Sequence, residues 1–251
     1  MASSRTTSRT GKRAMRARFL RVGLCLGLTL GLAACGDGSG SPDPSCNEGD
    51  PRGPVLASIG ESVIVPRQES FAQLTAALES AISAASQTPE DEAARTTAQT
   101  SWREAMDAWQ AVELMLVGPA SSRSNSRGGL GLRAEIYSWD DMNRCLLNTQ
   151  TIGSDYDDPE ALAEDVATQR GLWAIEYLLF NADTDNECSE LNEINQDGSW
   201  DDMLDVLKER RLRHAASLAT LVRQDAEELV RQWASGGENF LAELSSPCRN
   251  G

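Results

Sequence analysis

The sequence predicts an all-α protein, an up-and-down helical bundle of four to five main helices. Apolar residues recur at helical spacing through several long segments of the chain. Helix-start signals, a proline followed by an acidic residue, precede two of these segments. No alternating apolar pattern of comparable strength predicts a strand.

The N-terminus reads as a lipoprotein signal peptide, residues 1–34. Basic residues without any acidic residue precede an apolar run of about 13 residues, too short to span a bilayer. The run ends in Leu32-Ala33-Ala34-Cys35, a bacterial lipobox pattern that predicts cleavage before Cys35 and lipidation of its thiol. An ordinary signal peptide with an accidental cysteine is the alternative.

A tether rich in Gly, Ser, Asp and Pro follows the lipidated cysteine. We expect it to cover residues 35–58, with the helical domain over 59–251. Gly36, rather than an aspartate, follows Cys35. This favours anchoring at the outer membrane, facing the periplasm, so the membrane is the first expected partner.

The acidic balance of the chain argues against nucleic acid as a partner. Removing the leader would take away 7 of the 23 basic residues and none of the 38 acidic ones, which leaves a net charge of −22. Such a surface repels DNA, RNA and anionic lipid.

Four further cysteines in an exported chain predict two disulfides. Three pairings are open, and we favour Cys46–Cys248, which joins the two ends, with Cys145–Cys188. A cysteine-based zinc site is not expected, because no CxxC pair occurs and His214 is the only histidine.

The first two helices are expected over residues 63–86, with a break at Pro66, and from about 88 to 117. Thr88-Pro89-Glu90 is a start signal for the second, which stops at Gly118-Pro119. A polar loop over 121–131 follows.

The later helices are expected over residues 132–146, 158–180 and 200–233, with a short helical tail to 244. Asp158-Pro159-Glu160 starts the middle one, and the polar stretch 181–199 reads as a loop. The tryptophans that fall at helical spacing are assigned to packing; they are Trp102, Trp109, Trp139 and Trp233.

Two carboxylates fall on apolar helix stripes. On a helical wheel Glu176 lies within the stripe formed by Leu172 and Leu179, and Glu113 lies on the face of Trp109. A buried carboxylate needs a partner or takes a proton. Two inward carboxylates from neighbouring helices predict a cation or ligand site. The alternative is a buried ion pair, with Arg133 or Arg170 as the donor.

The segment Gly171-Leu172-Trp173-Ala174-Ile175-Glu176, with the apolar run that follows, resembles the imelysin-like family signature Gly-x-His-x-x-Glu. Further resemblances cover residues 63–244; they include Val63-Ile64-Val65-Pro66, Ser101-Trp102, Ala108-Trp109-Gln110 and Arg133-Ala134-Glu135-Ile136-Tyr137-Ser138-Trp139. The resemblance implies a helical bundle, a metal pair at the His and Glu positions, and a role in iron uptake or handling or as a metallopeptidase.

Two departures from the family pattern shape the functional hypothesis. Trp173 stands where the family has histidine, and an indole has no lone pair for a metal. Family members commonly have two bundles, whereas one is expected here. We therefore expect no catalytic residues and a non-catalytic envelope protein that binds a ligand, a divalent metal such as iron, or another envelope protein.

In this hypothesis Glu176 and Glu113 are the metal or ligand residues, supported by Gly171, Trp173 and Arg133. The alternatives are an envelope metallopeptidase and a structural or interaction module with a buried ion pair at the motif.

Overall fold

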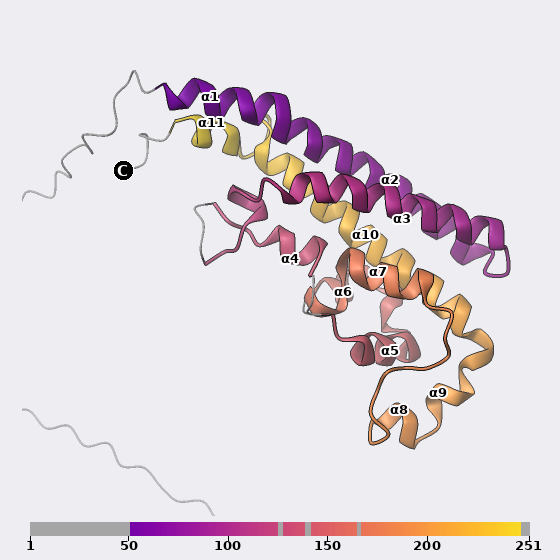
Figure 1. Ribbon diagram of the computed structural model, residues 1–251. Coiled ribbons are helices and arrows are strands. Elements are labelled where there is room, and N and C mark those ends of the chain that lie inside the picture. The colour runs from indigo at the N-terminus through magenta and orange to yellow at the C-terminus, as the bar shows by residue number, and fades with distance from the viewer. Residues whose placement is uncertain (1–50, 125–127, 139–141, 165–166, 247–251) are drawn as a thin grey trace, which may run out of the picture. The chain divides into compact units, whose positions relative to one another are not determined.

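A computed structural model describes residues 51–124, 128–138, 142–164 and 167–246, all within one compact unit, 41–251. Over these residues the regular structure is entirely helical, which confirms the all-α prediction (Figure 1). None of the helices in these ranges is long and apolar enough to cross a membrane. The expected lipidation site Cys35, with Cys46, Trp139 and Cys248, lies outside the described residues.

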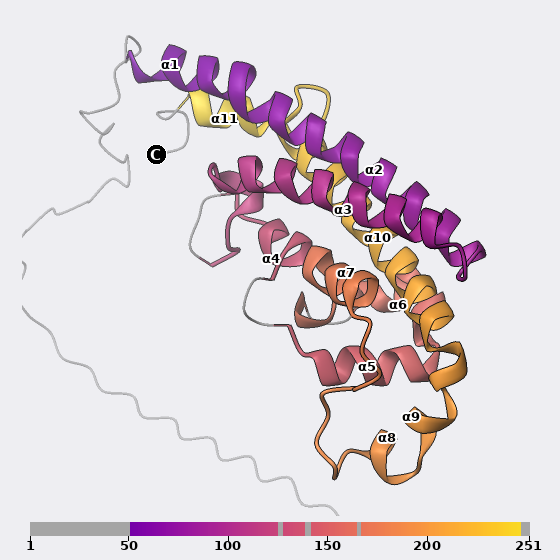
Figure 2. The ribbon, with the colours of Figure 1, turned by 45° about the vertical axis from the view of Figure 1, so that its right-hand side comes forward.

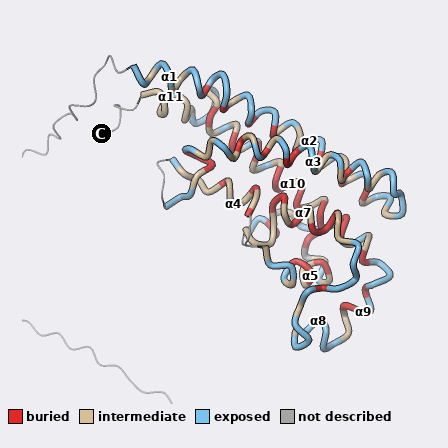
Figure 3. The backbone as a smooth tube through the Cα atoms, in the orientation of Figure 1, coloured by how far each residue is buried: buried red, intermediate tan, exposed pale blue. Residues whose placement is uncertain are grey.

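Three long helices form the body of the bundle: α2 (Val65–Gln87), α3 (Glu92–Glu113) and α10 (Leu207–Trp233). Figures 1 and 2 show them running side by side, and α10 packs against α2 along its length. Their facing sides are apolar at helical spacing, and the buried residues in Figure 3 gather where the helices meet. The largest fully buried side chains include Phe71, Trp109 and Trp233.

The chain enters the bundle through one nearly continuous helical segment. α1 (Arg52–Ile59) begins inside the stretch expected to be a tether, and it leads through a π-helical turn, Gly60–Ile64, into α2. Pro66 does not break this helix, because it lies in the first turn of α2, where the π turn already replaces the usual bonding pattern. α1 packs against α11 (Phe240–Ser245) from the other end of the chain.

The shorter helices differ most from the sequence prediction. The expected helix over 132–146 is two helices, α4 (Leu132–Ile136) and α5 (Arg144–Gly153). The expected helix over 158–180 is α6 (Pro159–Ala163) and α7 (Gly171–Phe180), and α7 starts at Gly171 after a 3₁₀ turn, Ala167–Gln169. That glycine has φ +85°, a left-handed conformation that no helix interior contains.

The region before α10 forms a small second core. The polar stretch 181–199 contains α8 (Glu193–Gln196), and α9 (Ser199–Asp202) precedes a 3₁₀ turn that leads into α10. Four buried residues make this core, with Cys188 packed against it; they are Ile194, Trp200, Met203 and Leu207. The expected Cys145–Cys188 disulfide is present and joins this region to α5.

Asp225 is a half-buried carboxylate on α10. Burial raises its pKa from 3.8 to about 7, against the attraction of Arg170 and together with the repulsion of Glu135. Arg170 is itself committed to Glu135, to which it donates two hydrogen bonds. No hydrogen bond or ion pair of Asp225 occurs within the described ranges. At neutral pH this carboxylate is therefore expected to oppose folding.

We predict that Asp225→Asn stabilises the protein at high pH and not at low pH. The folded pKa lies above the unfolded one, so the folded state binds the extra proton and the wild type loses stability as pH rises from about 4 to about 7. After solvent screening, the variant should gain about 1–2 kcal/mol at pH 8 and nothing at pH 4. Urea unfolding at both pH values measures this. Asp185→Asn, at an exposed loop position, is the control, and an equal gain at both pH values would contradict the assignment.

Candidate functional site

A groove of about 540 Å³ lies between α3 and α7 and contains the motif carboxylate. α7 contributes Trp173 and Glu176, and Tyr137 comes from the segment after α4. The remaining lining residues are on α3; they are Trp102, Arg103, Met106, Asp107 and Gln110. The groove thus combines three aromatic rings, two carboxylates and one guanidinium.

The apolar character of α7 decides which side chains face this groove. Leu172, Ile175 and Leu179 are fully buried, because α7 packs against both α3 and α10. The less buried stripe consists of Trp173, Glu176 and Phe180, which are three and four residues apart and share one helix face. Glu176 therefore lies on the open face of α7, and not within the buried stripe where the helical wheel placed it.

Gly171 fixes where this helix face begins. A Cβ at this position would lie 2.7 Å from the carbonyl oxygen of Ile136 and 2.9 Å from that of Glu135, so the start of α7 rests directly on the backbone of α4. On the other side, the Trp102 indole N–H donates a 2.9 Å hydrogen bond to the carbonyl of Leu172. These contacts hold the first turn of α7 between α3 and α4.

Glu176 is half-buried, and burial raises its pKa, with a smaller opposing effect from the charge of Arg144. Within the described ranges it forms no hydrogen bond and no ion pair. The aromatic rings beside it are close together, with the centroids of Tyr137 and Trp173 6.3 Å apart. A half-buried carboxylate beside aromatic rings, with no hydrogen-bond partner among the described residues, can accept a hydrogen bond or pair with a cation.

Glu113 does not share this groove. Its carboxylate accepts a 3.0 Å hydrogen bond from Nε of Arg133, and the Nη2 of the same arginine lies 3.0 Å away. The structure thus places Glu113 and Arg133 in the ion pair that was the alternative interpretation, and it pairs Arg170 with Glu135. The two carboxylates expected to converge do not come together.

The donor set does not fit a resident transition-metal centre. Among the residues that the structure describes, no three His, Cys, Asp or Glu side chains are placed to hold a metal ion. Trp173, three residues before Glu176 on the same helix face, has no lone pair that could bind a metal. His214 is fully buried on α10, where its Nδ1 lies 3.0 Å from the Thr151 hydroxyl and its ring stacks on Tyr156. Burial lowers the pKa of His214 to about 3, so it stays neutral inside the core.

Comparison with known protein families decides the affiliation. The imelysin family model matches residues 64–250, which is most of the chain and includes all three long helices and the motif on α7. The chain belongs to the imelysin family. No curated protein and no solved structure matches it significantly. Within this imelysin, Gly171 and Glu176 occupy the two retained positions of the motif described above, and Trp173 occupies the third.

Sequence reasoning missed the α3 side of the groove in this imelysin. Arg103, Asp107 and Gln110 are spaced four and three residues apart, a polar stripe beside Trp102 and Met106. That periodicity was visible, but only the packing of α7 against α3 shows that the stripe faces Glu176. Trp102, assigned to packing, both packs and lines the groove, whereas Trp109 and Trp233 are fully buried as expected.

Proposed function

We propose that this imelysin is a non-catalytic binding protein of the cell envelope, anchored to the outer membrane through lipidated Cys35 and facing the periplasm. The lipobox pattern, the tether and the even cysteine count support the location. The binding site is the groove between α3 and α7. The observation that carries this proposal is the half-buried Glu176, which has no partner within the described ranges and lies among aromatic rings.

The chemistry of the groove favours an organic cation as ligand. Aromatic faces attract cations, and a carboxylate in partly desolvated surroundings adds a charge-assisted hydrogen bond. Among the lining residues, Glu176 and Asp107 outnumber the single cation, Arg103, whose guanidinium lies 4.9 Å from the centroid of the Phe180 ring. A ligand carrying an ammonium group would fill the space between Trp173 and Trp102 and pair with Glu176.

The groove offers few ligands for iron, the metal that the family resemblance suggests. Glu113 is neutralised by Arg133, so a bare divalent ion would find Glu176 and Asp107 and no third protein carboxylate described in the groove. Stable sites for such ions need more ligands than this. A metallopeptidase would in addition need a bound metal that polarises a water molecule. Trp173 stands at the motif position of the histidine that would bind this metal, and it cannot act as a ligand. Binding without hydrolysis is the function that the groove supports best.

The first test is the substitution Glu176→Gln. We expect it to weaken binding of an alkylammonium ligand at least about tenfold, the cost of losing one charge-assisted contact. Isothermal calorimetry with butylamine and choline measures this, with butanol as the uncharged comparison and Fe²⁺ as the metal arm. The same variant should not melt at a lower temperature than the wild type, because it removes an unpaired, partly desolvated charge.

Glu69→Gln, at an exposed position of α2, is the matched control and should leave both affinity and melting temperature unchanged. Equal affinity of the wild type for butylamine and butanol would overturn the cation assignment. Tight Fe²⁺ binding lost in Glu176→Gln would replace it with a metal site. Peptide hydrolysis abolished by the same variant would show an enzyme.

A further inference from the structure

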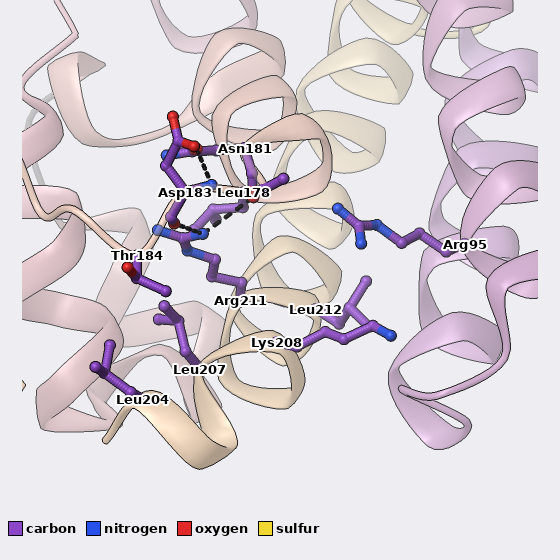
Figure 4. A pocket seen from close by; sticks show the side chains of 11 residues that line it. Arg95, Leu178, Asn181, Asp183, Thr184, Leu204, Leu207, Lys208, Arg211 and Leu212 are labelled. Carbon is purple, nitrogen blue, oxygen red and sulfur yellow. Dashed lines mark hydrogen bonds between the residues drawn. The ribbon is translucent and has the colours of Figure 1, made fainter. Parts of the chain in front are cut away.

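A second cavity, of about 180 Å³, lies at the opposite end of α7 from Gly171 (Figure 4). It is formed where the C-terminus of α7 meets the first turns of α3 and α10, and the loop 181–184 covers one side. Three cations line it: Arg95 from α3, with Lys208 and Arg211 from α10. Leucine side chains of α7, of α10 and of the 3₁₀ turn before α10 form most of the remaining wall. It shares no lining residue with the groove that contains Glu176.

Arg211 is the unusual member of this set. Its side chain is 4 % exposed, yet it forms no ion pair with a carboxylate in the described part of the chain. Nη1 donates hydrogen bonds of 3.0 and 2.9 Å to the carbonyl oxygens of Asn181 and Asp183. Nε and Nη2 have no acceptor among the described residues, and the guanidinium lies 5.7 Å from the Tyr177 ring centroid. Burial lowers its pKa, with a smaller contribution from the repulsion of Arg95, and the nearby Tyr177 and Asp183 oppose this lowering.

Capping of the C-terminus of α7 does not account for the positive charges of both Arg95 and Arg211. Arg95 donates to the carbonyl oxygen of Leu179, at 3.3 Å from Nη2, and Gln99 donates to the same oxygen at 3.0 Å. The C-terminus of a helix carries roughly half a negative charge, which one cation balances. Arg211 is therefore a second buried guanidinium beside a dipole that Arg95 already satisfies. Burying a charge without an opposite charge beside it costs folding free energy, and a bound anion would reduce this cost.

We infer that this cavity is a binding site for a small oxyanion, a carboxylate on a short aliphatic chain. The carboxylate would accept from Arg211 and Arg95, and the alkyl group would contact the leucines of α7 and α10. Opposing charge is also present: Asp183 is an exposed residue of the loop itself, and Glu92 pairs with Lys208 at 2.7 Å. These carboxylates limit the site to one anionic group of small size, which also matches the volume.

The leucine wall distinguishes a carboxylate from inorganic phosphate. A phosphate would place four polar oxygens against apolar side chains, which leaves some of them without donors. A short-chain carboxylate presents its charge at one end and its alkyl carbons at the other. Isobutyrate is therefore expected to bind more tightly than phosphate to the same two guanidinium groups, Arg95 and Arg211.

The test is calorimetric titration of the full chain with isobutyrate, inorganic phosphate and isobutylamine. We expect millimolar or tighter binding of isobutyrate and weaker binding of phosphate. The affinity for isobutylamine should not change in Arg95→Gln, because the amine is expected to bind only in the groove that contains Glu176. Arg211→Met and Arg95→Gln should each lower the affinity for isobutyrate at least about tenfold. Because Arg211 also holds the loop 181–184, Arg95→Gln and the milder Lys208→Gln keep the test valid if Arg211→Met does not fold.

Arg213→Gln is the matched control, since Arg213 lies two residues from Arg211 on α10, is 44 % exposed and pairs with Asp157 outside the cavity. Its affinity for isobutyrate should equal that of the wild type. Binding of phosphate without isobutyrate would overturn the carboxylate assignment. Absence of binding by either anion, or equal losses in Arg213→Gln and Arg95→Gln, would overturn the site.

Discussion

Replacement of Gly171 by alanine is expected to destabilise the protein by about 3 kcal/mol, through backbone strain and a clash that add. Gly171 has φ +85°, which disfavours any side chain. In addition, the new Cβ would lie 2.7 Å from the carbonyl oxygen of Ile136. Neither group can move easily, because one is the start of α7 and the other is the backbone of α4. Denaturant unfolding monitored by circular dichroism measures the loss.

Gly198 provides the control for this substitution. It has a similar left-handed conformation, with φ +80°, but no atom lies within 4 Å of the position that its Cβ would occupy. Gly198→Ala should therefore cost only the conformational strain, about 1 kcal/mol. The difference between the two variants isolates the contact of α7 with α4. Equal losses would show that this contact contributes nothing.

The contact matters for function because it sets the register of α7. Gly171 and the hydrogen bond from Trp102 hold the first turn, and the first two turns present Trp173 and Glu176 to the groove. A Gly171→Ala protein that remains folded at low temperature should bind alkylammonium ligands more weakly than the wild type. If the folded Gly171→Ala variant binds alkylammonium ligands as tightly as the wild type, the contact at Gly171 is not needed to form the groove.

The long helices could be predicted from the sequence because their information is local. The stripes of α3 and α10 repeat every 3.6 residues over many turns, and each stripe is long enough to outweigh irregularities. The division between α6 and α7 could not be predicted in the same way. A single glycine is tolerated inside many helices, and only the nearby carbonyl oxygens of α4 show why Gly171 takes a left-handed conformation.

The candidate site was predictable only in part, for a related reason. An acidic residue in an apolar run is a local anomaly, so Glu176 could be identified without a structure. Its surroundings depend on which faces of α3 and α7 meet. A helical wheel of a helix as short as α7 does not determine which of its faces packs against α3. Glu113 showed the same local anomaly, yet tertiary packing placed Arg133 beside it and left Glu176 without such a partner among the described residues. Arg211, in contrast, looked like any other arginine of a polar helix face.

Loss of the Cys145–Cys188 disulfide is expected to have the other large effect on stability, about 4 kcal/mol for a loop closed over 43 residues in the chain-entropy treatment. The closed loop contains α5, α6 and α7, and therefore the whole motif. The small core around Trp200 should loosen first, since Cys188 packs against it. The double variant Cys145→Ser, Cys188→Ser, compared with the oxidised wild type in urea, measures the cost.

Reduction with dithiothreitol separates the covalent effect from the side-chain change. The reduced wild type should unfold at the same urea concentration as the double variant, and reductant should not shift the variant unless Cys46 and Cys248 form a second bridge. Because Cys188 closely follows the loop 181–184 in the chain, isobutyrate binding at Arg211 should weaken with reduction. Binding in the α3–α7 groove should change less, because Trp102 and the backbone of α4 hold the start of α7 without the disulfide. Equal weakening at both sites would mean that the disulfide supports the bundle as a whole, and an unchanged midpoint would mean that packing alone holds the small core in place.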